Sequence, residues 1–199
     1  MIRTVLAALA AFIITPTVSL ADPMPVSELS AYLNRLKTAT ASFTQIGPDG
    51  RQDSGNFYVQ RPYRMRFEYQ TQPLLVLASG GEVAVFDGKS NVGAQEYPMS
   101  KTPLSLILAP TIDLEAQGVI VAHGEVNGRT VITLKDPKGN TPGNIEISFD
   151  PGPVLAGWVA TDEMGQRTTV LLEGLRSGVE FRETTFAIES EKNRRDPDR

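Results

Sequence analysis

Residues 61–69 decide the fold, and they read Arg61-Pro62-Tyr63-Arg64-Met65-Arg66-Phe67-Glu68-Tyr69. From Arg64 onward, charged and apolar side chains alternate along the chain. This period of two is typical of a β-strand that faces a core on one side and water on the other. It places Met65, Phe67 and Tyr69 on the concave or core face of a sheet and the charged side chains in solvent.

Similar short runs continue beyond this stretch and are separated by turn residues. The chain has 17 Gly and 14 Pro among its 199 residues, which favours many short strands over a few long helices. Sequential strands joined by tight turns form an antiparallel meander, and a twisted sheet of about eleven strands tends to curl into a barrel or half-barrel. The expected strands are residues 42–46, 55–60, 63–70, 74–79, 83–87, 91–97, 119–123, 130–135, 144–149, 155–161, 167–172 and a short one at 179–181.

An amphipathic helix is predicted ahead of the first strand. Ser27 is a suitable N-cap, and the helix is expected to end near Ala39. Its apolar positions are Leu29, Tyr32, Leu33 and Leu36. This spacing describes one helix face, which we expect to pack on the sheet. The alternative, a helix that lies on a membrane, would have more Lys and Arg.

A second helical segment is expected at residues 102–111. Thr102 can cap it, Pro103 suits the first helical position, and Pro110 stops it. The apolar residues between them are Leu104, Leu106, Ile107 and Leu108. A loop this apolar is expected to cover a buried surface.

The two ends of the chain are expected to lie outside the fold. Residues 1–21 have the pattern of an export signal: a positive Arg3, an apolar run at residues 5–14 and a small-x-small site at Ser19-Leu20-Ala21. The apolar run is too short to span a bilayer, so we expect a removed signal peptide. Residues 22–190 are expected to form a single domain. Residues 191–199 contain no apolar side chain and are expected to be a charged, disordered tail.

Composition excludes most catalytic and nucleic-acid-binding classes. The chain has no Cys and one His, so cysteine nucleophiles, thiolate zinc sites and two-histidine metal sites are absent, and we expect no cofactor. A Ser-His-Asp triad would depend entirely on His123, which lies at the end of an apolar strand and has no identifiable partner. The net charge of −4, with no basic stripe, argues against nucleic acid as a partner.

Several motifs in this chain resemble those of the periplasmic outer-membrane lipoprotein carrier family, LolA, and occur in the same order. The motifs are Ser42-Phe43-Thr44-Gln45, Gly55, residues 61–69, Asp87-Gly88-Lys89 and residues 102–108. The resemblance is strongest over residues 27–110. It implies a mainly β (α+β) fold, an unclosed antiparallel half-barrel of about eleven strands with helices lidding a hydrophobic cavity.

The resemblance also implies a function without catalysis. Carriers of this family take acylated lipoproteins from an ATP-driven exporter in the inner membrane and pass them, through the periplasm, to an outer-membrane acceptor of the LolB type. A monomer without a cofactor is expected. Arg61 matches the family's Arg-Pro arginine, which hydrogen-bonds lid backbone carbonyls in the closed state. The alternative for Arg61 is a surface arginine at the end of a strand.

The cavity candidates are the apolar residues of the alternating strand and of the second helical segment. They are Met65, Phe67, Tyr69, Leu104, Leu106, Ile107 and Leu108. Some of them can instead be plain core, and Trp158 can be either. We expect the lids and the sheet to close on each other when empty, which offsets part of the free energy gained from cargo.

Two other functions fit an exported chain of this architecture. One is a lipid- or glycolipid-binding or acyl-sensing module of the same fold. The other, which the sequence favours less, is an exported all-β hydrolase.

Overall fold

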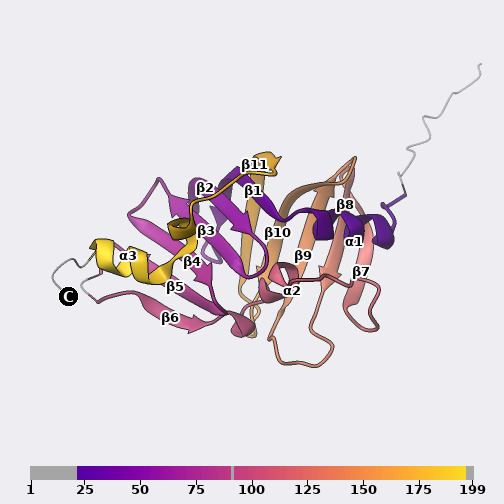
Figure 1. The fold of residues 1–199 in the computed structure, drawn as a ribbon. Helices are drawn as coiled ribbons and strands as arrows, with labels where there is room; N and C mark the ends of the chain where they lie inside the picture. The colour runs from indigo at the N-terminus through magenta and orange to yellow at the C-terminus, as the bar shows by residue number, and fades with distance from the viewer. Residues whose placement is uncertain (1–21, 91, 196–199) are drawn as a thin grey trace, which may run out of the picture.

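The strands form one antiparallel sheet of eleven strands in a computed structural model, which describes residues 22–90 and 92–195 (Figure 1). The strands are β1 (Thr38–Ile46), β2 (Gln52–Gln60), β3 (Arg64–Tyr69), β4 (Leu74–Ser79), β5 (Glu82–Asp87), β6 (Gln95–Pro98), β7 (Ile120–Val126), β8 (Arg129–Leu134), β9 (Asn144–Asp150), β10 (Val154–Thr161) and β11 (Arg167–Ser177). Their order is β6-β5-β4-β3-β2-β1-β11-β10-β9-β8-β7, so β6 and β7 are the edges and the sheet is unclosed. The predicted fold class, an open antiparallel half-barrel with few helices, is confirmed.

The sheet bends where the strand register shifts and where glycine allows two backbones to approach. Registers shift in β1, β7 and β10, and such bulges increase the local twist. A Cβ on Gly55 would lie 1.9 Å from the backbone oxygen of Glu68 on the neighbouring strand. Gly157 has a φ of 152°, and its Cβ would lie 2.2 Å from the oxygen of Val170. Side chains at these two positions would push the strands apart.

The concave face of the sheet carries the main core. On β3 the predicted alternation holds for the buried Met65 and Phe67, and β9 repeats it with Ile145, Ile147 and Phe149. Two short helices cover this face, α1 (Val26–Arg35) and α2 (Ser105–Leu108) (Figure 1). The apolar strand faces and the apolar helix faces thus bury each other.

Both helices differ from their expected bounds. In α1, Pro25 occupies the N-cap position and Ser27 lies inside the helix. The helix stops at Arg35 because β1 already begins at Thr38. The second segment is helical over only four residues, those of α2. Thr102 does not cap this helix. Its hydroxyl donates to Met99 O at 2.9 Å and ends a preceding 3-10 turn, η1 (Met99–Lys101).

The C-terminal segment corrects two predictions. Residues 179–181 do not form a strand, and residues 191–195 are not disordered. The chain forms a 3-10 helix, η2 (Glu183–Phe186), and then α3 (Ile188–Arg195), both packed on the convex face of β3 and β4. Phe186 fills a second apolar cluster there, on the side of the sheet opposite the lids. Residues 196–199 and the expected signal peptide lie outside the described residues.

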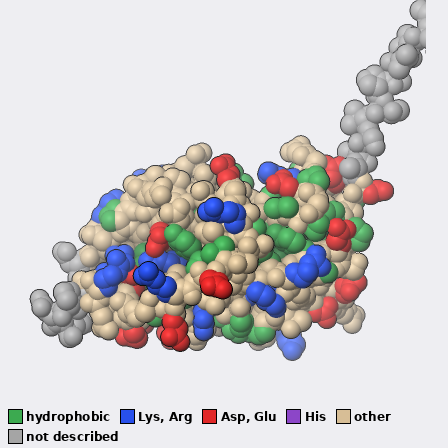
Figure 2. Space-filling model, turned by 45° about the horizontal axis from the view of Figure 1, so that its top comes forward, with side chains coloured by type: hydrophobic (Ala, Val, Ile, Leu, Met, Phe, Trp, Pro, Cys, Tyr) green, Lys and Arg blue, Asp and Glu red, His purple; other side chains and the backbone are tan. Residues whose placement is uncertain are grey.

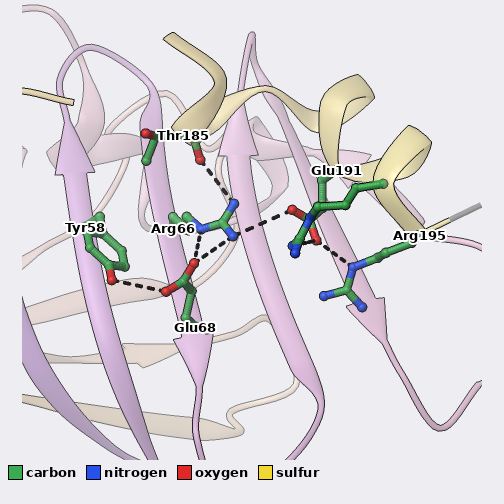
Figure 3. Close-up of polar contacts among 7 residues, drawn as sticks. Tyr58, Arg66, Glu68, Thr185, Glu191 and Arg195 are labelled. Atoms are coloured by element: carbon green, nitrogen blue, oxygen red, sulfur yellow. Dashed lines mark hydrogen bonds and ion pairs between the residues drawn. The ribbon is translucent and has the colours of Figure 1, made fainter. Parts of the chain in front are cut away.

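Charge pairing explains why a segment without an apolar pattern is ordered (Figure 3). The Glu191 side chain is 5% exposed and accepts hydrogen bonds from Arg194 and Arg195 of its own helix. Arg66 of β3 lies 3.6 Å from Glu191, donates to the Thr185 carbonyl (3.1 Å) and pairs with Glu68 at 2.7 Å. The expectation that the charges of β3 all face water is therefore wrong for Arg66, because α3 and η2 cover it.

No helix among residues 22–90 and 92–195 is both long and apolar enough to cross a membrane.

Candidate functional site

The candidate site is the apolar interior between the concave sheet face and the two helices. We call residues 26–36, which comprise α1 and Leu36, the first lid, and residues 104–114, which include α2, the second lid. A small cavity of about 30 Å³ remains between them. It has room for no more than about two water molecules. Its lining residues are Leu33, Leu36, Phe57, Val59, Arg61, Met65, Ile107, Leu108, Ile147, Leu155 and Trp158.

The expected hydrophobic cavity is thus nearly filled when the lids are closed. Trp158 is 3% exposed and lies against two phenylalanine rings, with centroid distances of 5.6 Å to Phe57 and 6.1 Å to Phe67. Phe43 continues this cluster at 4.9 Å from Phe67. The interior can admit a larger apolar group only if the lids move away from the sheet.

The predicted cavity residues divide into three groups. Met65, Ile107 and Leu108 line the small cavity directly. Phe67 lies one layer away, in the aromatic cluster. The remaining three are only partly buried and pack at the margins of the core: Tyr69, Leu104 and Leu106.

Tyr69 occupies a more polar position than its neighbours on β3. Its hydroxyl donates to Gln45 Oε1 at 2.8 Å. Burial raises the pKa of Tyr69 to about 12, so the hydroxyl stays protonated and can keep donating. Tyr69 therefore ends the apolar face of this strand with a hydrogen bond.

Several lining residues were not among the predicted cavity residues. They are Leu33, Leu36, Phe57, Val59, Ile147 and Leu155. The apolar stripe of the first lid includes Leu33 and Leu36. Phe57 and Val59 alternate with other side chains along β2. The sequence therefore contained a signal for these four residues. The sequence could not show that β9 and β10, which follow β2 by about 90 residues, face the same cavity as β2.

Arg61 is the polar exception in this apolar interior. It follows the last residue of β2 and is 8% exposed. One guanidinium nitrogen donates to the Leu33 carbonyl of the first lid. Nη2 donates to the Ala109 carbonyl of the second lid at 2.6 Å and to the Pro110 carbonyl at 3.5 Å, and Nε donates to Ala109 O at 3.2 Å.

These contacts explain how a cation can lie under the lids. Burial lowers the pKa of Arg61, but a guanidinium remains charged throughout the physiological range. Helix ends offer backbone carbonyls that lack partners within the helix, and these take the place of water around the charge. A single buried group therefore joins the sheet to both lids.

Other hydrogen bonds also join the sheet to the lids. The Tyr63 N–H, just after Arg61, donates to the Leu108 carbonyl at 2.9 Å. On the opposite side of the interior, the Leu155 N–H of β10 donates to the Tyr32 hydroxyl at 3.0 Å. Burial raises the pKa of Tyr32, although its hydrogen bond with Leu155 acts in the opposite direction.

The model of the family described as outer membrane lipoprotein carrier protein LolA matches residues 34–189. The chain belongs to the LolA family. The matched range contains Arg61, Trp158 and the whole second lid. An outer-membrane lipoprotein carrier protein of Methylococcus capsulatus is 34% identical over 173 residues, which cover 81% of this chain and 81% of that protein.

Two further proteins are similar to this chain at lower identity. An outer-membrane lipoprotein carrier protein of Azotobacter vinelandii is 27% identical, with 87% of each chain covered. A solved LolA superfamily protein of Nitrosomonas europaea has 8% identity and a TM-score of 0.39, and covers 84% of this chain and 99% of that one.

One face of this LolA-family protein mixes apolar and charged side chains. Figure 2 shows one face, on which hydrophobic side chains gather near the beginning of the described chain and charged ones are spread around them. The histidine that a hydrolase would need, His123, is exposed on the edge strand β7, with Nε2 3.0 Å from the Met24 carbonyl oxygen. It lies outside the interior that the lids cover.

Proposed function

We propose that this protein is a periplasmic carrier that covers the acyl chains of lipoproteins released from the inner membrane and delivers them to an outer-membrane acceptor, without catalysing a reaction. The single observation that carries the proposal is the buried Arg61, which donates hydrogen bonds to carbonyls of both lids above an apolar interior. Membership of the lipoprotein carrier family supports the class of cargo.

The free energy gained by shielding an acyl chain is comparable with the cost of opening the lids. At about 0.8 kcal/mol per CH₂, a sixteen-carbon chain gains roughly 12 kcal/mol when it is fully shielded from water. Water between the two membranes offers no other apolar surface, so a carrier must supply it. A closed interior with space for about two waters cannot do this without moving the lids.

The cost of opening is of the same order. Seven apolar lid side chains are buried in the closed state: Leu29, Leu33, Leu36, Ile107, Leu108, Ile112 and Leu114. At about 1.5–3 kcal/mol for each, their full exposure costs roughly 10–20 kcal/mol. Because cargo and lids compete for the same apolar surface, loading stays reversible and the cargo can be handed on.

Arg61 gives the closed state a defined geometry. Its hydrogen bonds require the carbonyls of Leu33 and Ala109 to lie next to different nitrogen atoms of one planar group. When the lids open, water can replace these carbonyls around the guanidinium, whereas nothing in water replaces the lost apolar contacts. The arginine therefore orients the closed lids, and the apolar contacts supply most of the closing free energy.

A reconstituted release reaction tests the proposal. Inner-membrane vesicles that contain the ATP-driven exporter and labelled lipoproteins are incubated with the purified protein, with and without ATP. We expect a soluble complex of protein and lipoprotein only when ATP is present, and subsequent transfer to vesicles that carry a LolB-like acceptor. If no complex forms, the carrier function is refuted.

Two further arms distinguish the alternative functions. Binding of glycolipid micelles, but not of lipoproteins, would favour a lipid-binding module of the same fold. Hydrolysis of an ester substrate that disappears in His123→Ala would favour the hydrolase. We expect neither result.

A further inference from the structure

The two lids are joined to each other by a second set of hydrogen bonds that does not involve Arg61. Asn34, near the end of α1, donates from Nδ2 to the Ile112 carbonyl at 2.7 Å. The Ile112 N–H donates back to Asn34 Oδ1 at 2.9 Å. The Ser30 hydroxyl donates to the same Ile112 carbonyl at 3.0 Å. One amide side chain thus pairs with both backbone polar groups of a single residue, as a neighbouring strand would.

Asn34 is also held by a hydrogen bond within its own helix. Its Nδ2 also donates to the Ser30 carbonyl one turn earlier in α1 at 2.9 Å. This internal bond directs the amide toward residue 112. Ile112 is 4% exposed and lies outside any helix or strand, and within the described residues its backbone groups are paired only by the side chains of α1.

The second lid depends on such contacts because its own helix is very short. The helix α2 has only four residues, and an isolated helix of that length is unstable in water. The conformation of the second lid must therefore depend on hydrogen bonds from residues outside this lid. Arg61 binds the carbonyls of Ala109 and Pro110 from the sheet side, and Asn34 binds Ile112 from the side of α1.

We propose that Asn34 joins the two lids into one body that leaves the sheet as a unit, while Arg61 is one of the separate links between that body and the sheet. Asn34 is a positioning residue: it keeps the second lid in register with the first lid when both are open. This inference rests on the proposed carrier function, in which the lids must open and close again. It predicts that the contacts between the lids survive the loss of the contacts to the sheet.

Two backbone amides report these contacts separately in the empty protein. The Tyr63 N–H donates to Leu108 O across the boundary between sheet and second lid, and the Ile112 N–H donates to Asn34 across the boundary between the lids. Hydrogen exchange measured by NMR gives a protection factor for each. In Arg61→Leu we expect the protection of Tyr63 to fall by about tenfold or more, while that of Ile112 changes by less than about threefold.

The complementary variant is Asn34→Asp. A carboxylate keeps an oxygen for the Ile112 N–H but loses the N–H donors, and it faces the Ile112 carbonyl with a second oxygen. We expect the protection of Ile112 to fall by about tenfold or more although its acceptor is retained, with a smaller change at Tyr63. The matched control is Asn193→Asp, at an exposed position of α3, which should change neither amide.

The outcomes distinguish this inference from the carrier function. If Tyr63 and Ile112 lose protection together in Arg61→Leu, or if Ile112 keeps its protection in Asn34→Asp, the lids are not one body joined by Asn34. Should Asn34→Asp fail to fold, Ser30→Ala removes one bond to Ile112 and is expected to lower its protection by about threefold, and an unchanged value overturns the inference. None of these measurements uses cargo, so failure of lipoprotein release would refute the carrier function alone.

Discussion

Replacement of Arg61 by Leu should make the protein bind acyl chains more tightly. The guanidinium donates hydrogen bonds to carbonyls of both lids, so it stabilises the closed form. We do not expect cargo binding to require a contact with this group. A ligand that binds only the open form has an apparent affinity reduced by the small fraction of molecules that are open. Destabilisation of the closed form therefore raises the apparent affinity, as long as the open form remains the minor one.

The magnitude follows from the hydrogen bonds that are lost. Arg61→Leu leaves the carbonyls of Leu33 and Ala109 without this donor in the closed form, at about 1–3 kcal/mol each. The new leucine offsets part of this cost with apolar contacts in the small cavity, so we take a net value of about 2–4 kcal/mol. At about 1.4 kcal/mol for each factor of ten, the open fraction and the apparent affinity should rise roughly 30-fold to 1000-fold.

Titration with a fluorescent acylated peptide measures this effect. The matched control is Arg64→Leu, which removes an exposed arginine three residues away whose nearest side-chain hydrogen bond, to Gln60 Oε1, is 3.4 Å long. We expect the affinity of Arg64→Leu to match that of the unmodified protein. If Arg61→Leu binds the peptide as weakly as this control, or more weakly, Arg61 does not hold the lids closed and the reasoning is refuted.

Three further predictions concern the lid edge, the C-terminal segment and the sheet. Leu106→Glu should weaken binding of the acylated peptide by about tenfold or more, because a carboxylate in the covered site loses hydration. Burial by itself raises the pKa of Glu191, but hydrogen bonds from two arginines of α3 and nearby arginine charges lower it below its ordinary value of 4.5. Its stabilising contribution is therefore complete above that value and is lost as pH falls through the lowered pKa, so Glu191→Gln should lose less thermal stability between neutral pH and about pH 3 than Glu189→Gln. Gly55→Ala should lower the free energy of unfolding by more than about 2 kcal/mol in urea denaturation, because the added Cβ would lie 1.9 Å from a backbone oxygen of β3, whereas Gly124→Ala has open space and should change it by less than about 1 kcal/mol.

Each of these three has a contrary result. Unchanged peptide binding by Leu106→Glu would remove that residue from the cargo site. An equal acid response in the two glutamine variants would mean that the paired carboxylate of α3 does not stabilise the folded chain. A fully stable Gly55→Ala would show that β2 and β3 can separate at no cost.

The sheet was predictable because its signal is local. The alternation of residues 64–69 and the regularly spaced turns reflect the pleat of a strand and the φ preferences of Gly and Pro, neither of which depends on the rest of the chain. The helix bounds were less predictable. Thr102 could cap a helix or end a turn, and only its distance to Met99 O decides between them.

The C-terminal segment shows where local patterns are insufficient. Residues 191–195 are strongly polar, and composition alone indicates disorder. In the folded chain, Glu191 meets Arg66, which lies 125 positions earlier in the sequence. A buried ion pair of this kind depends on two segments that the sequence gives no reason to bring together.

By itself, the sequence determined the class of sheet, the apolar faces of β3 and α1, and, through a resemblance, the expectation that Arg61 contacts lid carbonyls. Only the tertiary structure decided that the interior is almost full, that one guanidinium contacts both lids, and that Asn34 pairs with Ile112. The physical reason is that period and turn chemistry are properties of neighbouring residues, whereas a cavity and its hydrogen bonds arise where β2, β10 and the two lids meet. The cavity that remains is small compared with the side chains packed around it, so its volume depends on the fold as a whole.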